Sequence, residues 1–521
     1  MKSDELAPWP GHDAGWETMV VEQLEGQLVR AKAFVADNVQ QPRRVAAHCG
    51  SLLTLMDRAR VFPSLQDPVL GLIAELDGWP TRWGFWSRWE ALLRFGIQAT
   101  VSHPDSEMYL HCLDELGNLL LSTGRTEQAL DTEKQAFQQA LAAERLDLAM
   151  HIVRLIVFIL VRQGRLDDID AFLHDISMRL QGGDAAAEIQ ALFSFNRARV
   201  LRRRGQLAEA FKEADLSVTL LKKTRVEDSH LVPDAYNMRG VMAWACGEYR
   251  PAERDLRRAI AVYSATCDQY AQARVLGTLG LLYWSLGKLS RAEVSIKRSI
   301  EMMEASGSQW QNTMNWGNLG LVYLSRGELS RARTYMEHQL SLAVKNNDTQ
   351  EVMRARSNLS AVLLHEGRFQ EAIAGLVADE TFQEQGGNAQ PEGLICDYVW
   401  HVRCLAGLGR EAAALALAQR TLAIARVSGS ISLKIAALRC LAELLPPGEQ
   451  KPLLVEALQF SKESGRKLDQ AACLLSLALT EQGERRDTRW REGRRLLASI
   501  GASAWLRGKT YDDPPFILII V

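Results

Sequence analysis

The stretch LGLLYWSLGKLSRA, from Leu279 to Ala292, returns one period later as LGLVYLSRGELSRA, from Leu319 to Ala332. Ten of the fourteen positions are identical, and the offset between the two stretches is 40 residues. Self-similarity at a fixed period of this size is typical of repeat proteins, in which each unit stacks on its neighbours. The pair therefore indicates that the chain is an array of repeats.

A ladder of glycines carries the same period through most of the chain. The glycines are separated by 40, 41, 42, 40, 40, 40 and 42 residues, and they are Gly124, Gly164, Gly205, Gly247, Gly287, Gly327, Gly367 and Gly409. Five residues after each glycine, with Ile169 as the exception, the chain has an alanine: Ala129, Ala210, Ala252, Ala292, Ala332, Ala372 and Ala414. Seven residues before most of them it has a small residue: Gly117, Ala198, Gly240, Gly280, Gly320 and Ser360.

Each unit predicts a hairpin of two helices. In the first helix, apolar residues recur at helical spacing, as in Leu276, Leu279, Leu282, Tyr283 and Leu286. The glycine ends this helix, because a helix C-terminus commonly needs a residue that tolerates the left-handed conformation. Small residues on both helices let the two backbones approach closely, so each hairpin can stack on the next.

These residues resemble the tetratricopeptide repeat (TPR) family. The match is best where the family's signature positions are occupied in order by Trp316, Leu319, Gly320, Tyr323, Gly327 and Ala332. The resemblance covers residues 106–483. It implies an all-α fold, a TPR-like α–α superhelix that is a right-handed helical-hairpin solenoid of about ten repeats.

The period departs from the family, since TPR units have about 34 residues and these have 40 to 42. HEAT repeats have the observed length but lack the glycine–alanine turn signature. The long period also resembles the helical-repeat sensor arrays of bacterial signal-transduction ATPases.

The chain is predicted to have three regions. Residues 1–105 form an N-terminal, Trp-rich helical region of degenerate repeats, with candidate helices at 16–38 and 43–60. Residues 106–483 form the repeats, and residues 484–521 a C-terminal capping helix and an apolar tail. Around Trp79, Trp83, Trp86 and Trp89 we expect a buried seam, and the alternative is an exposed aromatic patch that binds a partner.

Composition narrows the classes of function. The formal net charge of −2 provides no global basic field for nucleic acid or an anionic membrane. The eight cysteines include no C-x-x-C pair with metal-ligand spacing, which favours reduced thiols in a cytoplasm. The longest apolar stretch, Ile152 to Val161, is shorter than a membrane span requires. We therefore expect a soluble cytoplasmic protein without a metal or cofactor.

Sequence motifs for catalysis do not form a coherent site. The string GASAWLRGKT, residues 501–510, has six residues between its glycines where a phosphate-binding loop has four. Cys396, His401 and Cys404 lie close together, and we interpret all three as core residues. The basic run at 485–495, which includes Trp490, is compatible with nucleic-acid binding, but interspersed acidic residues favour a solvated helix face. The chain is predicted not to be an enzyme.

One row of side chains is the candidate binding surface. We define the contact row as the residues thirteen and nine positions before the turn glycine in three successive repeats: Arg274, Thr278, Met314, Asn318, Arg354 and Asn358. In the TPR family, the first helices line the concave surface, and asparagines at the Asn318 and Asn358 positions often bind a peptide backbone. The arginines would add charge-assisted contacts to carboxylates. The alternative is an ordinary wet face.

The resemblance therefore implies a non-catalytic scaffold or regulator that binds another protein or a peptide in a concave groove. The alternative is a regulatory or inhibitory subunit of a separate effector enzyme, a protease or ATPase, in a bacterial signalling or defence system. A membrane partner is not expected, and nucleic acid is not favoured.

Overall fold

A computed structural model of the chain describes residues 14–39, 41–180, 187–223, 231–305, 309–346, 348–385 and 391–506. All regular secondary structure in these residues is helical, which confirms the all-α prediction. The chain divides into two compact units, residues 1–155 with 265–268 and residues 156–264 with 269–521. The boundaries predicted at residues 105 and 483 divide the chain by type of repeat, whereas these units are divided by compactness. The two boundaries therefore stay predictions. The apolar tail after residue 510 lies outside the described residues.

The first unit begins with two helices at the places expected from the sequence. Its elements are α1 (Ala14–Asp37), α2 (Pro42–Ala59), η1 (Pro63–Leu65), α3 (Gln66–Leu76), α4 (Trp79–Arg82), α5 (Trp86–Thr100), α6 (Glu107–Ser122), α7 (Thr126–Ala142) and the first part of α8 (Leu146–Gln163). The tryptophan-rich segment spans α4 and the start of α5. Trp89 is fully buried, and the Trp86 indole donates to the Thr81 carbonyl at 2.8 Å. Trp79 and Trp83 are half-buried and lie 5.2 Å apart between ring centroids, so the segment is partly buried and Trp89 is its one fully buried tryptophan.

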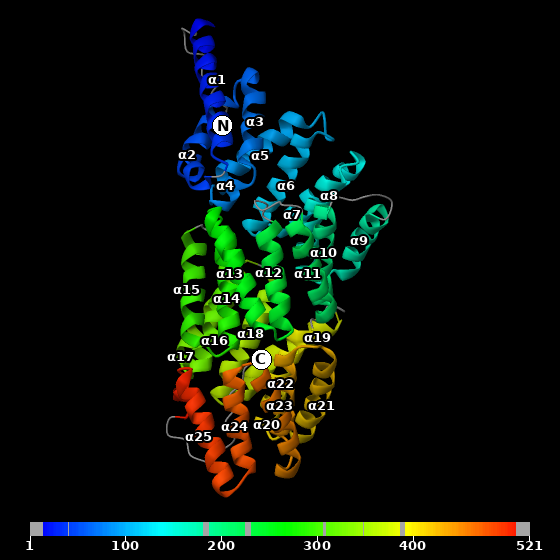
Figure 1. The fold of residues 1–521 in the computed structure, drawn as a ribbon, viewed down its shortest axis with the longest axis vertical. Coiled ribbons are helices and arrows are strands. Elements are labelled where there is room, and N and C mark those ends of the chain that lie inside the picture. Colours follow the sequence, from blue (N-terminus) through cyan, green and yellow to red (C-terminus); the bar gives the residue numbers. More distant parts are fainter. Residues whose placement is uncertain are drawn as a thin grey trace, which may run out of the picture. The chain divides into compact units, whose positions relative to one another are not determined.

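The second unit contains the rest of the array (Figure 1). Its helices are α9 (Leu166–Leu180), α10 (Ala187–Arg203), α11 (Leu207–Lys223), α12 (Leu231–Ala245), α13 (Tyr249–Ala265), α14 (Gln269–Ser285), α15 (Leu289–Ala305), α16 (Gln309–Arg326), α17 (Leu329–Lys345), α18 (Thr349–His365), α19 (Phe369–Gln385), α20 (Pro391–Gly407), α21 (Glu411–Val427), α22 (Ile431–Ala442), α23 (Pro447–Glu463), α24 (Lys467–Thr480), α25 (Gly483–Ser499) and η2 (Ser503–Leu506). From α10 onward, even-numbered helices are the first and odd-numbered helices the second of each hairpin.

The turn glycine ends the first helix of each hairpin in the predicted way. All eight glycines of the ladder have positive φ, between 71° and 83°. At Gly287 the glycine N–H donates to the Trp284 carbonyl at 2.9 Å, and the Lys288 N–H donates to the Tyr283 carbonyl at 2.8 Å. This pair of bonds is the Schellman motif, which uses carbonyls that the helix end leaves free. The period is therefore set by a local backbone requirement.

The small residue before the turn lets the two helices of a hairpin approach. A Cβ added at Gly280 would lie 2.5 Å from Cγ1 of Ile296 and 3.3 Å from the Ala292 carbonyl oxygen. Gly320 has the same relation to the side chain of Met336. The residue nine positions after the turn glycine therefore packs on the glycine seven positions before it, and the predicted close packing is confirmed.

Indole groups connect consecutive repeats. The Trp244 Nε1–H donates to the Ser285 hydroxyl at 3.1 Å, and the Trp284 Nε1–H donates to the Ser325 hydroxyl at 2.8 Å. Each tryptophan is buried or half-buried and lies about one period from its serine. A buried indole commonly needs such a partner, so these bonds fix the spacing between neighbouring hairpins.

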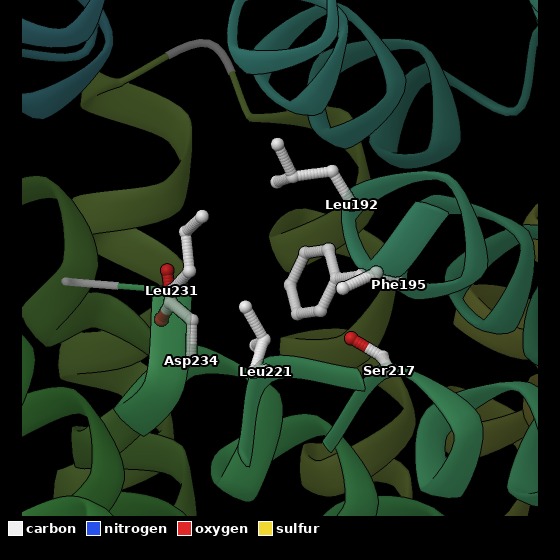
Figure 2. A pocket seen from close by; sticks show the side chains of 7 residues that line it. Leu192, Phe195, Ser217, Leu221, Leu231 and Asp234 are labelled. Atoms are coloured by element: carbon white, nitrogen blue, oxygen red, sulfur yellow. The ribbon is translucent and has the colours of Figure 1, made fainter. Parts of the chain in front are cut away.

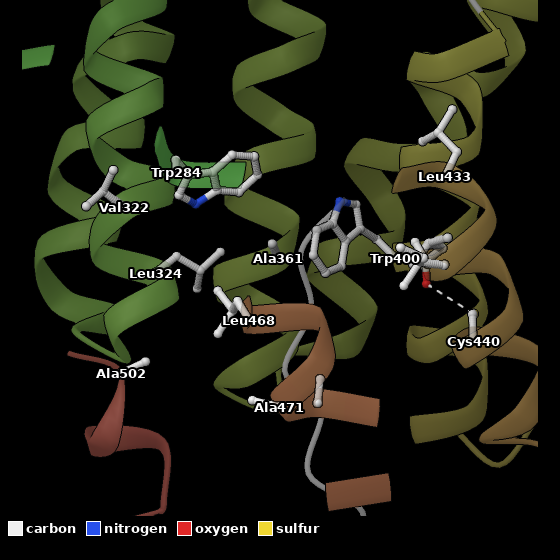
Figure 3. Packing of buried hydrophobic residues seen from close by; sticks show 14 of the residues in the cluster. Trp284, Val322, Leu324, Ala361, Trp400, Leu433, Cys440, Leu468, Ala471 and Ala502 are labelled. Atoms are coloured by element: carbon white, nitrogen blue, oxygen red, sulfur yellow. Dashed lines mark hydrogen bonds between the residues drawn. The ribbon is translucent and has the colours of Figure 1, made fainter. Parts of the chain in front are cut away.

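Within the second unit, the last hairpins pack end-on against the turns of the middle ones. Leu468 at the start of α24 lies beside the turn at Gly287, and the Trp505 indole in η2 donates to the Ser325 carbonyl at 3.0 Å. Figure 3 shows Leu468 and Ala471 of α24 in the same hydrophobic cluster as Trp284. No sequence pattern predicts this packing, because the contacting residues are about 180 positions apart.

This layering encloses the first helices of the C-terminal hairpins. Eight consecutive residues of α22, from Ile435 to Ala442, are buried, and so are five of α24, from Ala471 to Leu475. A helix with one solvent-facing side cannot bury eight residues in a row, because these cover two full turns. Neither α22 nor α24 therefore presents an open face, and a binding surface on first helices must lie earlier in the array.

Candidate functional site

The contact row lies on the first helices α14, α16 and α18, as the offset from the turn glycine predicts. The residue at the same offset in the preceding repeat is Asp234 in α12. The Arg274 guanidinium pairs with Asp234, with 2.7 Å between Nη2 and Oδ1. Residues at one offset in successive repeats are thus direct neighbours, and the row is continuous from α12 to α14.

Arg274 is held firmly by this partner but is not fully covered. Burial opposes its charge, but the Asp234 carboxylate outweighs burial and raises the pKa of the Arg274 guanidinium. The Tyr263 hydroxyl donates to the same carboxylate at 2.6 Å. The Arg274 side chain keeps 33% of its surface exposed. Thr278, one turn later, donates its hydroxyl to the Arg274 carbonyl at 3.3 Å, which leaves its side chain engaged within the helix.

The two asparagines of the row differ in their surroundings. Asn318 is only 5% exposed, so its amide cannot reach a ligand unless its surroundings move. Asn358 is half-buried, and its Nδ2 donates to Oε1 of Gln339 at 3.1 Å. Gln339, which is fully buried in α17, donates in turn to Glu351 at 3.2 Å.

Arg354 joins the same network from its exposed side. Its Nη1 lies 3.3 Å from Oε1 of Glu351, and 46% of its side chain is exposed. Glu351 is buried, and its N–H is capped by Asp348, the residue that precedes α18. The structure thus brings Arg354 and Asn358 together through Gln339 and Glu351. Of the predicted polar residues, Arg354 is exposed, Asn318 is buried, and the half-buried ones are Arg274, Thr278 and Asn358.

Three residues of this surface were not predicted from the sequence. Asp234 had a usable signal, because it stands at the same offset from Gly247 as Arg274 from Gly287. Gln339 lies in a second helix, and Glu351 lies one turn before the positions that define the contact row. No sequence pattern therefore pointed to either residue. Their role depends on how α17 packs between α16 and α18.

Two hollows also occur in the described residues, and Asp234 borders the first of them. The first, between α10, α11 and α12, has a volume of about 10 Å³ and is lined mainly by Leu192, Phe195, Ser217, Leu221, Leu231 and Asp234 (Figure 2). This volume is about enough for one water molecule, so it is not a ligand pocket. The second is an open hollow of about 280 Å³ in the first unit, lined by Gln27 of α1 and by Gly50, Ser51, Thr54, Leu55 and Arg58 of α2.

Two residues of the other sequence motifs, Cys404 and Trp490, are buried. Cys404 is buried, and burial raises the pKa of its thiol to about 12, so the thiol is not activated. No group of His, Cys, Asp and Glu residues in the described part of the chain is arranged to hold a metal ion. Trp490 is buried against the core, so it is not available to stack on a nucleic-acid base. Among the described residues, no helix is both long and apolar enough to cross a bilayer.

Comparison with protein families identifies the repeats directly. A family model described as tetratricopeptide repeat matches residues 234–268, and a second with the same description matches residues 273–304. These ranges cover the hairpins α12–α13 and α14–α15, including Asp234 and Arg274. The sequence has no match among curated proteins.

Several solved structures are similar to the chain at low sequence identity. The chain is similar to a Rap protein complexed with competence and sporulation factor, with 12% identity over 68% of this chain and 99% of that chain and a TM-score of 0.53. It is also similar to NprR in complex with its cognate peptide NprX, with 13% identity over 66% and 98% of the two chains and a TM-score of 0.48. For a signal-transduction ATPase with a tetratricopeptide repeat sensor from Pyrococcus horikoshii, identity is 12% over 72% and 57%, with a TM-score of 0.43.

The glycine turns, the close-packed hairpins and the two family matches agree with one another. Residues 234–268 and 273–304 are tetratricopeptide repeats within an array of TPR-like helical hairpins.

Proposed function

We propose that this protein is a regulator or scaffold that binds another protein or a peptide through the contact row of α14, α16 and α18. The observation that carries the proposal is the exposed surface of Arg274 on α14 and of Arg354 on α18, the first helices on either side of α16. Guanidinium groups bind carboxylates through charge-assisted hydrogen bonds. The ligand is therefore an acidic segment or a chain end that presents a carboxylate to each arginine.

Each of the two arginines already binds a carboxylate of the protein itself. Asp234 and Glu351 already place a carboxylate against each guanidinium, so the row is built to hold this chemical group. A guanidinium has five donors, and one carboxylate does not occupy them all. The fold is also that of the Rap protein complexed with competence and sporulation factor, so a peptide ligand is compatible with this architecture.

The test uses the full chain as bait and then a purified partner. Proteins retained by the wild-type chain are identified by mass spectrometry, and the affinity of the purified partner is measured by calorimetry. We expect Arg274→Ala with Arg354→Ala to weaken binding at least tenfold, since each lost charge-assisted bond contributes about 1.5–3 kcal/mol. Arg298→Ala is the matched control, because Arg298 is an exposed arginine on the second helix α15.

Equal affinity of the double variant and the control for the partner would refute the proposal that the contact row binds it. Unchanged helical circular dichroism must accompany the loss, so that misfolding is separated from lost contact. The identity of the partner distinguishes a scaffold from the finer alternative, a regulatory subunit of a separate effector enzyme. We place this activity in a bacterial cytoplasm, where the eight cysteines of the chain stay reduced.

A further inference from the structure

The first complete hairpin, α6–α7, breaks a rule that the other repeats keep. Nine residues after the turn glycine, seven repeats have a buried apolar residue: Leu173, Ala214, Leu256, Ile296, Met336, Leu376 and Ala418. In the first repeat the corresponding residue is Glu133, which is 0% exposed. A carboxyl group in place of an apolar core side chain is costly unless it has a specific partner, so this position calls for an explanation.

Glu133 occupies the same place in its hairpin as the apolar residues do in theirs. Its carboxyl group contacts Gly117, the small residue seven positions before the turn, as Ile296 contacts Gly280. The packing itself is therefore unchanged, and only the chemistry at the centre of the hairpin differs. A leucine would fit this site, because Leu256 packs in the same way on Gly240.

The Glu133 carboxyl group has no donor and has a second carboxyl group as a neighbour. No N–H or hydroxyl donor reaches either oxygen of Glu133, and Oδ1 of Asp114 is also buried without a donor. Asp114 lies on α6 one helical turn before Gly117, which the Glu133 carboxyl contacts, and the negative charge of Asp114 raises the pKa of Glu133. Two carboxyl groups can share a hydrogen bond only when one of them carries a proton, because an ionised carboxylate has no donor.

The surrounding charges increase the need for that proton. The groups that face the pair and its neighbour Glu115 are Asp77 after α3, Arg82 in α4, His111 in α6, and His151 and Arg154 in α8. Four carboxyl groups therefore face two guanidinium groups and two imidazole groups. Burial first, and the charge of Asp114 second, raise the pKa of Glu133 well above its usual range.

We propose that the Glu133–Asp114 pair is a proton-operated switch in the α6–α7 hairpin, closed while the pair holds one proton and loosened when the proton leaves. Release of the proton places two adjacent carboxylates in the interior beside Glu115. Their repulsion and their loss of hydration both favour separation of α7 from α6. The switch lies in the first unit and does not depend on the contact row of the second unit.

The direction of the pH effect follows from the raised pKa. The stabilising contribution is fully present below the pKa of a glutamate in the unfolded chain, and it is lost as the pH rises toward the pKa in the folded hairpin. Opening of the hairpin should therefore become more frequent from acidic to alkaline pH. For one proton released, the opening equilibrium changes by up to about tenfold per pH unit.

The test measures amide hydrogen exchange of the α6 and α7 peptides in the full chain at several pH values, corrected for the intrinsic exchange rate. We expect wild-type opening to increase with pH, and Glu133→Leu, which restores the residue type of the other repeats, to abolish the increase. Asp131→Asn, at an exposed position of the same helix, should behave as wild type. Parallel profiles for wild type and Glu133→Leu would overturn the proposal.

A second measurement, infrared spectroscopy, tests the proposal on the wild-type chain and so does not depend on how well a variant folds. Infrared spectroscopy of the wild-type chain at neutral pH should show the carbonyl stretch of a buried protonated carboxyl group. The band should disappear in Glu133→Gln or shift in Asp114→Asn and should persist in Asp131→Asn. A wild-type spectrum without this band at any pH at which the chain is folded would also overturn the proposal.

Discussion

Arg403 and Glu443 form a buried ion pair one period apart, and its disruption gives a sharp test of the C-terminal packing. The guanidinium of Arg403, in α20, donates from Nε and Nη2 to the two oxygens of Glu443 at 2.7 and 2.9 Å. The side chains are 4% and 13% exposed. Burial opposes the charge of Arg403, and Glu443 outweighs it and raises the pKa of the guanidinium.

Glu443→Ala leaves the Arg403 charge buried without this partner. Removal of one member of a buried pair destabilises a protein by about 3–5 kcal/mol, because the remaining charge is not compensated. An exposed pair offers the contrast: Arg298 and Glu301 lie 3.2 Å apart and both are largely exposed. Glu301→Ala should change stability by at most about 1 kcal/mol.

The assay is amide hydrogen exchange of peptides from α20 and α22, since a repeat array need not unfold in a single step. A loss of about 3 kcal/mol corresponds to exchange on the order of a hundredfold faster in these peptides. The peptides of α6 and α7 should not change. A Glu443→Ala effect no larger than that of Glu301→Ala would refute the view that the C-terminal core encloses this pair. The double variant Arg403→Met with Glu443→Leu should recover most of the loss, because it removes both charges.

Three further outcomes are expected. Gly280→Ala should lower stability by about 1–3 kcal/mol in chemical denaturation, since the added Cβ meets Ile296 in a filled core; unchanged stability would contradict the close approach of the two helices. Trp284→Phe should lower stability by about 1 kcal/mol or more, because it removes the indole donor to Ser325, and a melting temperature equal to wild type would speak against this bond. Cys404 should resist alkylation at neutral pH until the chain is unfolded, because burial raises the pKa of its thiol to about 12; rapid labelling of the native protein, followed by mass spectrometry, would show that the site is open.

The helical hairpins could be predicted from the sequence because their determinants are local. A left-handed residue at Gly287 and close packing at Gly280 involve neighbours within one hairpin, so they repeat with the period and are visible as a ladder. The same periodicity located the contact row and, applied to Asp234, would have supplied the partner of Arg274. The anomaly at Glu133 was also present in the sequence, as the exception at an otherwise apolar position.

The exposure of each side chain depended on tertiary structure. Asn318 and Asn358 share one offset, but the first is buried and the second bonds Gln339, because each helix meets different neighbours. The packing of Leu468 and Trp505 against turns about 180 residues earlier encloses α22 and α24 and confines any open row to earlier repeats. By itself, the sequence determined the fold of each unit and its period, since these follow from backbone conformation and packing within a hairpin. Only the tertiary structure decided which faces of the repeats remain accessible, because contacts between distant hairpins have no period and leave no pattern in the chain.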